Sequence, residues 1–447
     1  MNLTANFKRL VIFTLQNIFG ESFFAEIQRG LRKYFTNTAW GFAGRISSMI
    51  VSFFVVVYVI RFLGPSQYGL LSYAVSFVGM FGILASLGID SILYRDLVKY
   101  PEKRDQILGT AFYLKMAGAA ASIIITLFAS YFLGDDFYTS FIIFLIAAPL
   151  IFQSFNVISS YFQSLVRAKL PILIIFFTNL FLSLLKIILV LLSAGLSYFA
   201  FVYLLEGVFL AAGFIFIYNR AKLSLFDWKF DFNLAKDLLK NSWPLAFASV
   251  FTIIYVRIDQ VLIKHLMDQS AVGIYDVGVR ISEIWHFVPA IIAASLFPAI
   301  INAKKVSQDL YNARLSKLYS LMIYSSFIII VPLFVLSGYI INLLFGSQFT
   351  EAANVVRIYA WAGIAVSIGT VASYYLLNEN YVKLALFSSI VGMSSNVLLN
   401  IVFIPIYGIS GAALATLISY ALVPASLVFF KETRPQLILI ARAFIFR

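Results

Sequence analysis

The chain has 447 residues, of which 62% are hydrophobic and only 12% charged, and this indicates a polytopic membrane protein rather than a soluble one. It has no cysteine and two histidines, which excludes disulfides, thiolate metal sites and thiol redox chemistry; we expect neither a metal site nor a cofactor. The formal net charge of +13 raises the question of nucleic-acid binding, which the positions of the basic residues answer below.

Residues 1–37 precede the first long apolar stretch, and in them apolar side chains alternate with charged and polar ones. This pattern is typical of an amphipathic helix lying on the cytoplasmic face of a membrane. The segment lacks a compact apolar core followed by a small-residue cleavage site, so we do not expect a signal peptide.

Apolar stretches long enough to cross a bilayer, roughly 20 residues each, follow one another through the rest of the chain. There are twelve: 38–62, 67–88, 107–133, 138–165, 170–193, 197–219, 242–266, 272–302, 316–345, 353–377, 381–404 and 410–430. Glycine and proline mark tight connectors between them, as in 63–66 and 405–408. The sequence therefore predicts an all-α protein with about twelve transmembrane helices.

The basic residues of the connectors predict the orientation, because lysine and arginine favour the cytoplasmic side. Of the 33 basic residues, 25 fall on one side of the predicted spans, and only Arg61 and Lys264 on the other. Both termini are thus expected in the cytoplasm, with the protein in the inner (cytoplasmic) membrane. The positive excess follows from topology and attraction to anionic membrane lipids, so no nucleic-acid partner is expected.

The chain repeats itself weakly. Tyr68-Gly69-Leu70 after the first span corresponds to Val272-Gly273-Ile274 after the seventh, and Lys186 and Asn400 occupy matching places in spans five and eleven. We therefore predict two six-helix bundles, 38–219 and 242–430, related by a pseudo-two-fold axis along the membrane normal. A cytoplasmic linker (220–241) would join them, and a cytoplasmic tail (431–447) would follow. Rocking of the bundles would give alternating access.

Six basic residues lie inside the predicted spans, although a charge at the centre of a bilayer costs about 2.5 to 3.5 kcal/mol on insertion scales. They are Arg45, Lys115, Lys186, Arg257, Arg280 and Arg357. Only four acidic residues share these stretches: Glu206, Asp259, Asp276 and Glu283. The interior is therefore expected to be net positive, which points to an anionic passenger.

Four of these cations form a candidate binding track. Arg45 and Lys115 would lie near the inner mouth, where the alternative is that each extends to the membrane interface, and Lys186 and Arg257 would lie deeper. A salt bridge between spans is the alternative for Arg257 and for Asp259. We interpret Arg357, near an outer span end, as an interface anchor.

The acidic residues are candidates for coupling transport to an ion. Asp276, Arg280 and Glu283 fall on one helical face, with His286 three residues further, so Arg280 is expected to be neutralised on its own helix. Alternatively, a buried glutamate takes up and releases a proton, or an acidic cluster holds sodium. Asp259, Asp276, Glu283 and Glu206 are the candidates, and the sequence leaves the choice between H+ and Na+ open.

A run of motifs resembles the bacterial oligosaccharide flippases, the Wzx-like polysaccharide-export family. It comprises Arg61-Phe62-Leu63-Gly64-Pro65-Ser66-Gln67-Tyr68-Gly69, Ser72-Tyr73-Ala74, Gly88-Ile89-Asp90, Arg95-Asp96-Leu97, Pro101-Glu102-Lys103-Arg104, Leu108-Gly109-Thr110 and Lys115. The similarity extends over roughly 30–430 and is most specific from 38 to 118. The extension before about Leu31 departs from the family pattern.

The resemblance implies membership of the multidrug, oligosaccharidyl-lipid and polysaccharide exporter superfamily, with two facing six-helix bundles. It also implies a non-enzymatic flippase whose passenger is an undecaprenyl-diphosphate-linked oligosaccharide, working with a polysaccharide polymerase and chain-length proteins. The cationic track would hold the diphosphate.

Two alternatives remain. A multidrug or cation antiporter of the same superfamily would have an acidic, aromatic cavity, against which the basic excess argues. A membrane-embedded polymerase or glycosyltransferase would need a sizeable outer loop or an acidic pair at the interface; Asp135-Asp136 is the one outer pair, and its connector is short.

Overall fold

The computed structural model describes the backbone of residues 21–444 and the side chains of 52–444 other than 91, 244, 245 and 382. Every regular element in this range is a helix, which confirms the all-α class. The side chain of Arg45 and the first 20 residues of the predicted N-terminal segment lie outside the described residues.

We refer to α2–α9 as the N-terminal half and to α10–α16 as the C-terminal half. The N-terminal half contains α2 (Glu21–Ser86), α3 (Asp90–Lys99), α4 (Arg104–Phe132), α5 (Phe137–Ala147), α6 (Pro149–Phe152), α7 (Asn156–Ser164), α8 (Lys169–Leu191) and α9 (Leu196–Arg220). The C-terminal half contains α10 (Phe232–Leu266), α11 (Gln269–Glu283), α12 (Phe287–Lys304), α13 (Gln308–Phe345), α14 (Ala352–Tyr359), α15 (Ala362–Asn378) and α16 (Val382–Ala425), with α17 (Arg434–Phe444) after it.

Nine helices in the described part of the chain are long and apolar enough to cross a membrane, or ten if the bent pair α14 and α15 forms one span. This is fewer than the twelve expected. Two of these helices are interrupted, because α2 and α16 each contain a glycine with a positive φ, Gly64 (69°) and Gly408 (58°), where the backbone leaves the helical conformation. Both glycines lie in connectors that the sequence predicts.

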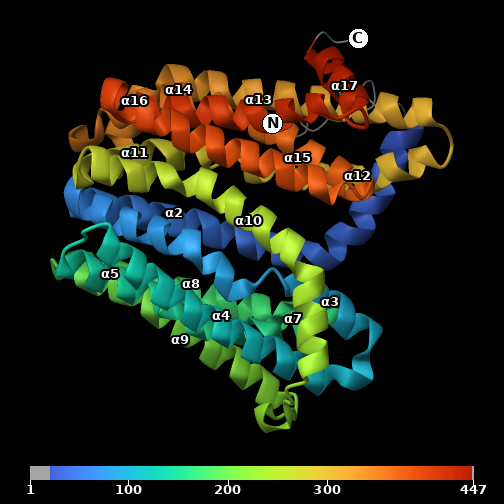
Figure 1. Cartoon of the computed structure of the whole chain (residues 1–447), viewed down its shortest axis with the longest axis horizontal. Helices are drawn as coiled ribbons and strands as arrows, with labels where there is room; N and C mark the ends of the chain where they lie inside the picture. Colours follow the sequence, from blue (N-terminus) through green and yellow to red (C-terminus); the bar gives the residue numbers. More distant parts are fainter. Residues whose placement is uncertain (1–20, 445–447) are drawn as a thin grey trace, which may run out of the picture.

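Helix α16 folds back on itself at this break. The Ser426 hydroxyl donates to the Ser388 hydroxyl at 3.1 Å although 38 residues separate them, whereas a straight helix would place them roughly 57 Å apart at 1.5 Å per residue. We call the parts of α16 before and after Gly408 its first and second legs. A Cβ at Gly411 would lie 2.1 Å from the carbonyl oxygen of Phe403, so only glycine allows the two legs to lie this close together. Figure 1 shows α2 likewise crossing the molecule and returning.

Short polar side chains begin several of the helices. Asp136, Asp231, Asp268 and Ser307 precede α5, α10, α11 and α13, and each accepts a hydrogen bond from the backbone N–H three residues later. Such caps satisfy amide groups that the first turn of a helix leaves without partners. They therefore set where these helices start at the membrane surfaces.

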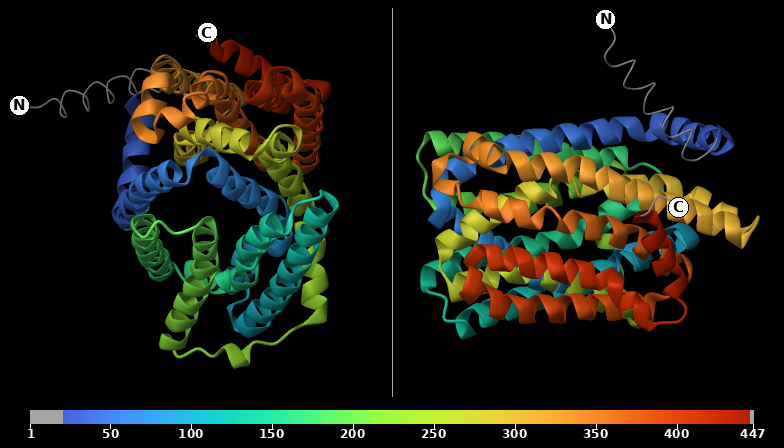
Figure 2. Two further views of the ribbon diagram at one scale, coloured as in Figure 1. Left: turned by 90° about the vertical axis from the view of Figure 1, so that its left-hand side faces the viewer. Right: turned by 90° about the horizontal axis from the view of Figure 1, so that it is seen from above.

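The two halves meet along α2. Figure 1 shows α4–α9 on one side of α2 and α11–α16 on the other, while α10 runs obliquely past both, and the end-on view in Figure 2 shows the same division. Helix α2 packs against α4 and α8 of its own half and against α10 and α11 of the other. Side chains on α2, α10 and α11 can therefore be shared between the halves.

At the end predicted to face outward, the halves are in backbone contact. A Cβ at Gly69 would lie 1.7 Å from the carbonyl oxygen of Gln269, and one at Gly273 would lie 2.2 Å from that of Pro65. These two glycines are the ones that correspond in the sequence repeat, and the fold places them face to face. Any larger residue at either position would push α2 and α11 apart.

An ion pair reinforces this outer contact. Lys264, at the end of α10, donates to Asp135 in the connector between α4 and α5. The same carboxylate accepts hydrogen bonds from the hydroxyls of Tyr73 and Ser130, each at 2.8 Å. Asp135 therefore has a partner on the C-terminal half, Lys264, and two partners on its own half, Tyr73 and Ser130.

Candidate functional site

A buried carboxylate surrounded by neutral donors lies within the C-terminal half. Asp259 on α10 is 2% exposed and accepts hydrogen bonds from the Tyr275 hydroxyl at 2.5 Å, from the Asn400 amide at 2.7 Å and from the Thr416 hydroxyl. These partners come from α11 and from both legs of α16, so the folding back of α16 builds the site. We call Asp259, Tyr275, Asn396, Asn400 and Thr416 the Asp259 network.

The Asp259 network is suited to hold a small cation or a proton. Among the described basic residues none forms a salt bridge with Asp259, and an isolated buried carboxylate is costly unless it is neutralised. The Asn400 side-chain oxygen is also buried without a hydrogen-bond partner in the described part of the chain. Carboxylate, amide and hydroxyl oxygens are the ligands of hard cations.

Asp276 on α11 is a second buried carboxylate, and unlike Asp259 it has a charged partner. It accepts hydrogen bonds from the Arg280 Nε and the Gln260 amide, both at 2.6 Å, and from the Tyr68 hydroxyl. Arg280 Nε also donates to the Tyr68 hydroxyl at 2.6 Å. Tyr68 belongs to α2, so this group spans the two halves; we call Asp276, Arg280, Tyr68 and Gln260 the Asp276 network.

Two further intramembrane cations, Arg257 and Lys186, interact electrostatically with members of the Asp276 network. Arg257 interacts electrostatically with Asp276, and Lys186, on α8 of the other half, interacts with Arg280 and with Glu206. The Lys186 ammonium lies 5.6 Å from the centre of the Tyr203 ring. The Arg280 side chain stays 40% exposed while it is paired with Asp276.

The other predicted site residues lie elsewhere. Lys115 forms an ion pair with Asp90 of α3, with side-chain exposures of 5% and 54%. Its charge is therefore compensated at the edge of the N-terminal half. Arg357 is exposed and donates to Ser337 at 3.1 Å and to Asn354 at 3.2 Å.

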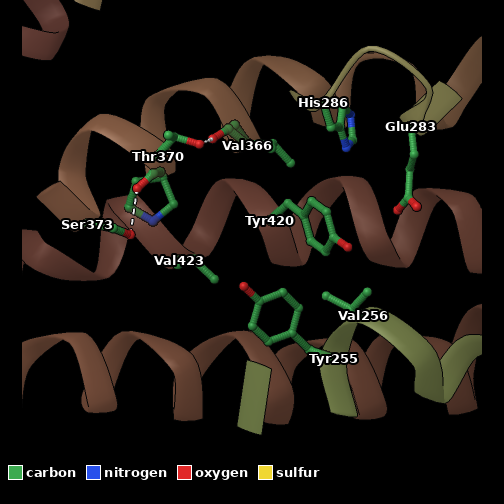
Figure 3. Close-up of a pocket in the computed structure, with 12 residues that line it drawn as sticks. Tyr255, Val256, Glu283, His286, Val366, Thr370, Ser373, Tyr420 and Val423 are labelled. Carbon is green, nitrogen blue, oxygen red and sulfur yellow. Dashed lines mark hydrogen bonds between the residues drawn. The ribbon is translucent and has the colours of Figure 1, made fainter. Parts of the chain in front are cut away.

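Arg280 has the predicted partner Asp276 on its own helix, but its second predicted partner, Glu283, turns away. The Glu283 carboxylate accepts a hydrogen bond from the Tyr359 hydroxyl at 2.7 Å. Glu283 instead lines a pocket of about 390 Å³ together with His286, and Figure 3 shows both side chains above Tyr420.

The sequence singles out Asp259 but does not assign its partners; it marks Asn400 only as the counterpart of Lys186 in the repeat. Asn396 and Asn400 are four residues apart in an apolar stretch, which places both amides on one helical face, and this spacing is the signal that could have found them. Thr416 and Tyr275 carry no comparable signal, because single hydroxyls are common in membrane helices. No group of three or more His, Asp or Glu side chains suited to a metal ion occurs in the described part of the chain.

Comparisons with known proteins identify a family and several relatives of this chain. The family described as polysaccharide biosynthesis protein matches residues 35–304. A protein of Haloferax volcanii named a probable low-salt glycan biosynthesis flippase is 28% identical over 236 residues, which cover 52% of this chain and about half (48%) of that protein. An uncharacterized membrane protein of Methanocaldococcus jannaschii is 26% identical over 80% of this chain and 88% of its own length.

Solved structures show the same fold. An inward-facing multidrug resistance transporter of the MATE family, within the MOP superfamily, superposes with a TM-score of 0.72 at 14% identity, covering 86% of this chain and 94% of that one. The lipid II flippase MurJ in an inward closed conformation gives 0.67 at 18% identity, covering 91% of each chain. The family match extends over more than half of the sequence, and the chain therefore belongs to the polysaccharide biosynthesis protein family.

Proposed function

We propose that this protein is a flippase that moves a lipid-linked oligosaccharide, carried on undecaprenyl diphosphate or a similar polyprenyl diphosphate, from the cytoplasmic to the outer leaflet of the cytoplasmic membrane. The observation that carries the proposal is that cations from both halves meet at one network: Arg257 interacts electrostatically with Asp276, and Lys186 interacts with the Arg280 that pairs with Asp276. A diphosphate crossing hydrocarbon needs fixed charges in place of its water, and arginine can grip phosphate oxygens in a fork.

Family membership and the relatives named as flippases support the same proposal. Of the four cations in the expected track, Lys186 and Arg257 keep their assigned role, and Arg280 joins them because its side chain is accessible. Lys115 is compensated by Asp90 and is assigned instead to stabilising α3 against α4. A transporter, rather than a polymerase or glycosyltransferase, accounts for these features.

We further propose that the ten apolar helices, with the bent pair α14 and α15 counted as one span, make twelve spans in two bundles. Helices α2 and α16 each count as two, because each reverses at its glycine. An even number of spans agrees with both termini on the cytoplasmic side, as the distribution of basic residues indicates. In this arrangement the glycine contact and the Lys264–Asp135 pair close the outer side, and the cargo enters from the cytoplasm.

The Asp259 network is the proposed coupling site. Binding of H+ or Na+ neutralises Asp259 and tightens the packing of α10, α11 and both legs of α16, while release loosens it. Since α10 and α11 also carry Arg257 and Arg280, a change in their packing reaches the cargo site directly. Asp276 is excluded from this role because Arg280 already neutralises it.

The test is transport by the purified chain in liposomes. An undecaprenyl-diphosphate-linked oligosaccharide is supplied on one leaflet, and its arrival on the other is measured by a membrane-impermeant glycosidase. We expect Arg257→Ala and Lys186→Ala each to slow flipping about tenfold, which corresponds to 1.4 kcal/mol, and the double variant to slow it more. Arg357→Ala, an exposed arginine, is the control. Unchanged flipping in the double variant would contradict the proposal.

A further inference from the structure

The pocket beside Glu283 is separate from the Asp259 network and has no role in the scheme above. It lies inside the C-terminal half between α10, α11, α15 and the second leg of α16, with a volume of about 390 Å³. Ligand pockets for small molecules begin at about 300 Å³. The space therefore suits one or two rings rather than a long chain.

Polar groups stand at both ends of this pocket. At one end are the Glu283 carboxylate and His286, whose Nε2 is buried without a hydrogen-bond partner in the described part of the chain. At the other end, the hydroxyls of Thr370 and Ser373 donate to carbonyls of their own helix at 2.8 Å each, which leaves their oxygens able to accept. Figure 3 shows the imidazole and the carboxylate directed into the same space.

Aromatic and aliphatic side chains form the middle of the pocket. The rings of Tyr255 and Tyr420 meet edge to face with centroids 5.4 Å apart, and Val256 and Val423 line the walls. The Tyr255 ring packs on Gly392, where an added Cβ would lie 3.2 Å from it. The rings are therefore held in place rather than free to close the pocket.

This lining discriminates between classes of ligand. An anion would be repelled by Glu283, and a prenyl chain would leave the carboxylate, the imidazole and the hydroxyls without hydrogen bonds. An organic cation suits a carboxylate with aromatic faces, but the Glu283 carboxylate already accepts a hydrogen bond from Tyr359, and a cation without acceptor groups would leave the buried Nε2 of His286 and the two hydroxyls without new hydrogen bonds. A neutral sugar ring, with hydroxyls at its edge and an apolar face, matches donors and acceptors at both ends and the apolar middle.

The pocket and the proposed diphosphate site draw on the same two helices, α10 and α11. Val256 in its wall directly precedes Arg257, and Glu283 follows Arg280 by three residues, about 4.5 Å along the helix. A ligand whose diphosphate contacts these arginines would carry its first sugar beside the pocket. Resting on the proposed function, we propose that this pocket binds the sugar ring next to the diphosphate, with Glu283 and His286 as its hydrogen-bonding groups, and so selects the glycan.

A glycine makes the proposal testable without damage to the fold. A Cβ at Gly369, on the pocket-facing side of α15, would meet nothing within 4 Å, so Gly369→Leu fills the pocket while adding a residue that favours helix. Gly195→Leu is the matched control, since Gly195 is exposed and also has no neighbour within 4 Å of an added Cβ.

The experiment measures equilibrium binding to the full chain in lipid nanodiscs. The probes are undecaprenyl diphosphate and the same lipid bearing one glucose, galactose or N-acetylglucosamine. For the wild type, we expect one of the sugars to raise affinity about tenfold over the bare lipid, equivalent to 1.4 kcal/mol. Gly369→Leu should abolish that gain and leave the affinity for the bare lipid unchanged, whereas Gly195→Leu should keep the gain.

Three outcomes would overturn the inference: equal affinity of the wild type for bare and sugar-bearing lipid, an undiminished gain in Gly369→Leu, or a loss in that variant of affinity for the bare lipid as well. Glu283→Gln separates a sugar from a cation, because glutamine keeps a hydrogen-bonding oxygen. If Glu283→Gln still binds the sugar-bearing lipid more tightly than the bare lipid, the inference is supported. If Glu283→Gln instead loses binding of tetraphenylphosphonium, and the sugar has no effect on affinity in the wild type, the pocket belongs to organic cations. If the wild type fails to bind even bare undecaprenyl diphosphate, the proposed function itself fails.

Discussion

Asp259 and Asp276 are both buried carboxylates, each 2% exposed, and they lie 17 residues apart in sequence, yet their surroundings differ in kind. Asp276 has a guanidinium partner, Arg280, and contacts the N-terminal half through Tyr68. Among the described residues, the hydrogen-bond partners of Asp259 are neutral and come from the C-terminal half. In the proposed function, the fixed counter-charge of Asp276 suits it to holding α2 and α11 together, and the neutral partners of Asp259 suit it to exchanging a proton or a metal cation.

The largest effect is expected from neutralising the carboxylate that lacks a counter-charge. Asp259→Asn keeps the shape of the side chain but removes the charge that we propose binds the coupling ion. We expect gradient-driven flipping in liposomes to fall at least about 100-fold, or 2.7 kcal/mol in the barrier, while the protein stays folded. Asp237→Asn, at an exposed position of the same helix, should be neutral. A gradient response that survives Asp259→Asn would remove the distinction between the two carboxylates.

Arg280→Ala should lower the free energy of unfolding. It leaves Asp276 buried and uncompensated, which costs 3 to 5 kcal/mol for fully buried pairs; since Arg280 is 40% exposed, we expect about 2 to 3 kcal/mol. Chemical denaturation in detergent measures the loss. The double variant Arg280→Ala with Asp276→Asn should recover most of it, because no charge remains unpaired. Failure of this rescue would show that packing, and not charge, sets the role of Arg280.

Gly69→Ala tests whether the Asp276 network depends on the contact between halves. Its methyl group would overlap the carbonyl of Gln269, which forces α2 and its Tyr68 away from α11. Because the chain has no cysteine, Ser72→Cys, one turn further along α2, can report accessibility. We expect a water-soluble maleimide to label it several-fold faster with Gly69→Ala. Gly79→Ala, where a Cβ has no neighbour within 4 Å, should not change the rate; equal rates in both variants would contradict a tight outer contact.

The smallest effects should come from single hydroxyls, which typically contribute about 1 kcal/mol each. Thr416→Val removes one donor to Asp259. Because that hydrogen bond favours the charged carboxylate, the variant should need a several-fold lower H+ concentration for half-maximal flipping if H+ is the coupling ion. If Na+ is the coupling ion, loss of the hydroxyl oxygen should raise the Na+ concentration needed several-fold. Tyr68→Phe removes one donor to Asp276 and should lower the free energy of unfolding by a similar amount without altering the ion dependence. If Tyr68→Phe also shifts the ion dependence, the two networks are coupled and the comparison needs revision.

The candidate site was predictable where charge in an apolar stretch is itself the signal. Asp259, Arg257, Arg280 and Lys186 stand out because a charge in hydrocarbon is costly, and the pairing of Arg280 with Asp276 follows from four-residue helical spacing. The pairing of Lys115 with Asp90 and the turn of Glu283 toward Tyr359 were not predictable. They depend on which helices lie side by side.

The sequence alone determined the helical class, the apolar spans and the glycine connectors, because a backbone in hydrocarbon must satisfy its own hydrogen bonds and only helices do so within one segment. The tertiary structure decided which polar groups meet. Asn400 and Thr416 reach Asp259 across 141 and 157 residues, and Arg280 reaches Tyr68 across 212. Helical periodicity fixes the face on which a side chain lies, but only the packing of one helix against another selects its partner.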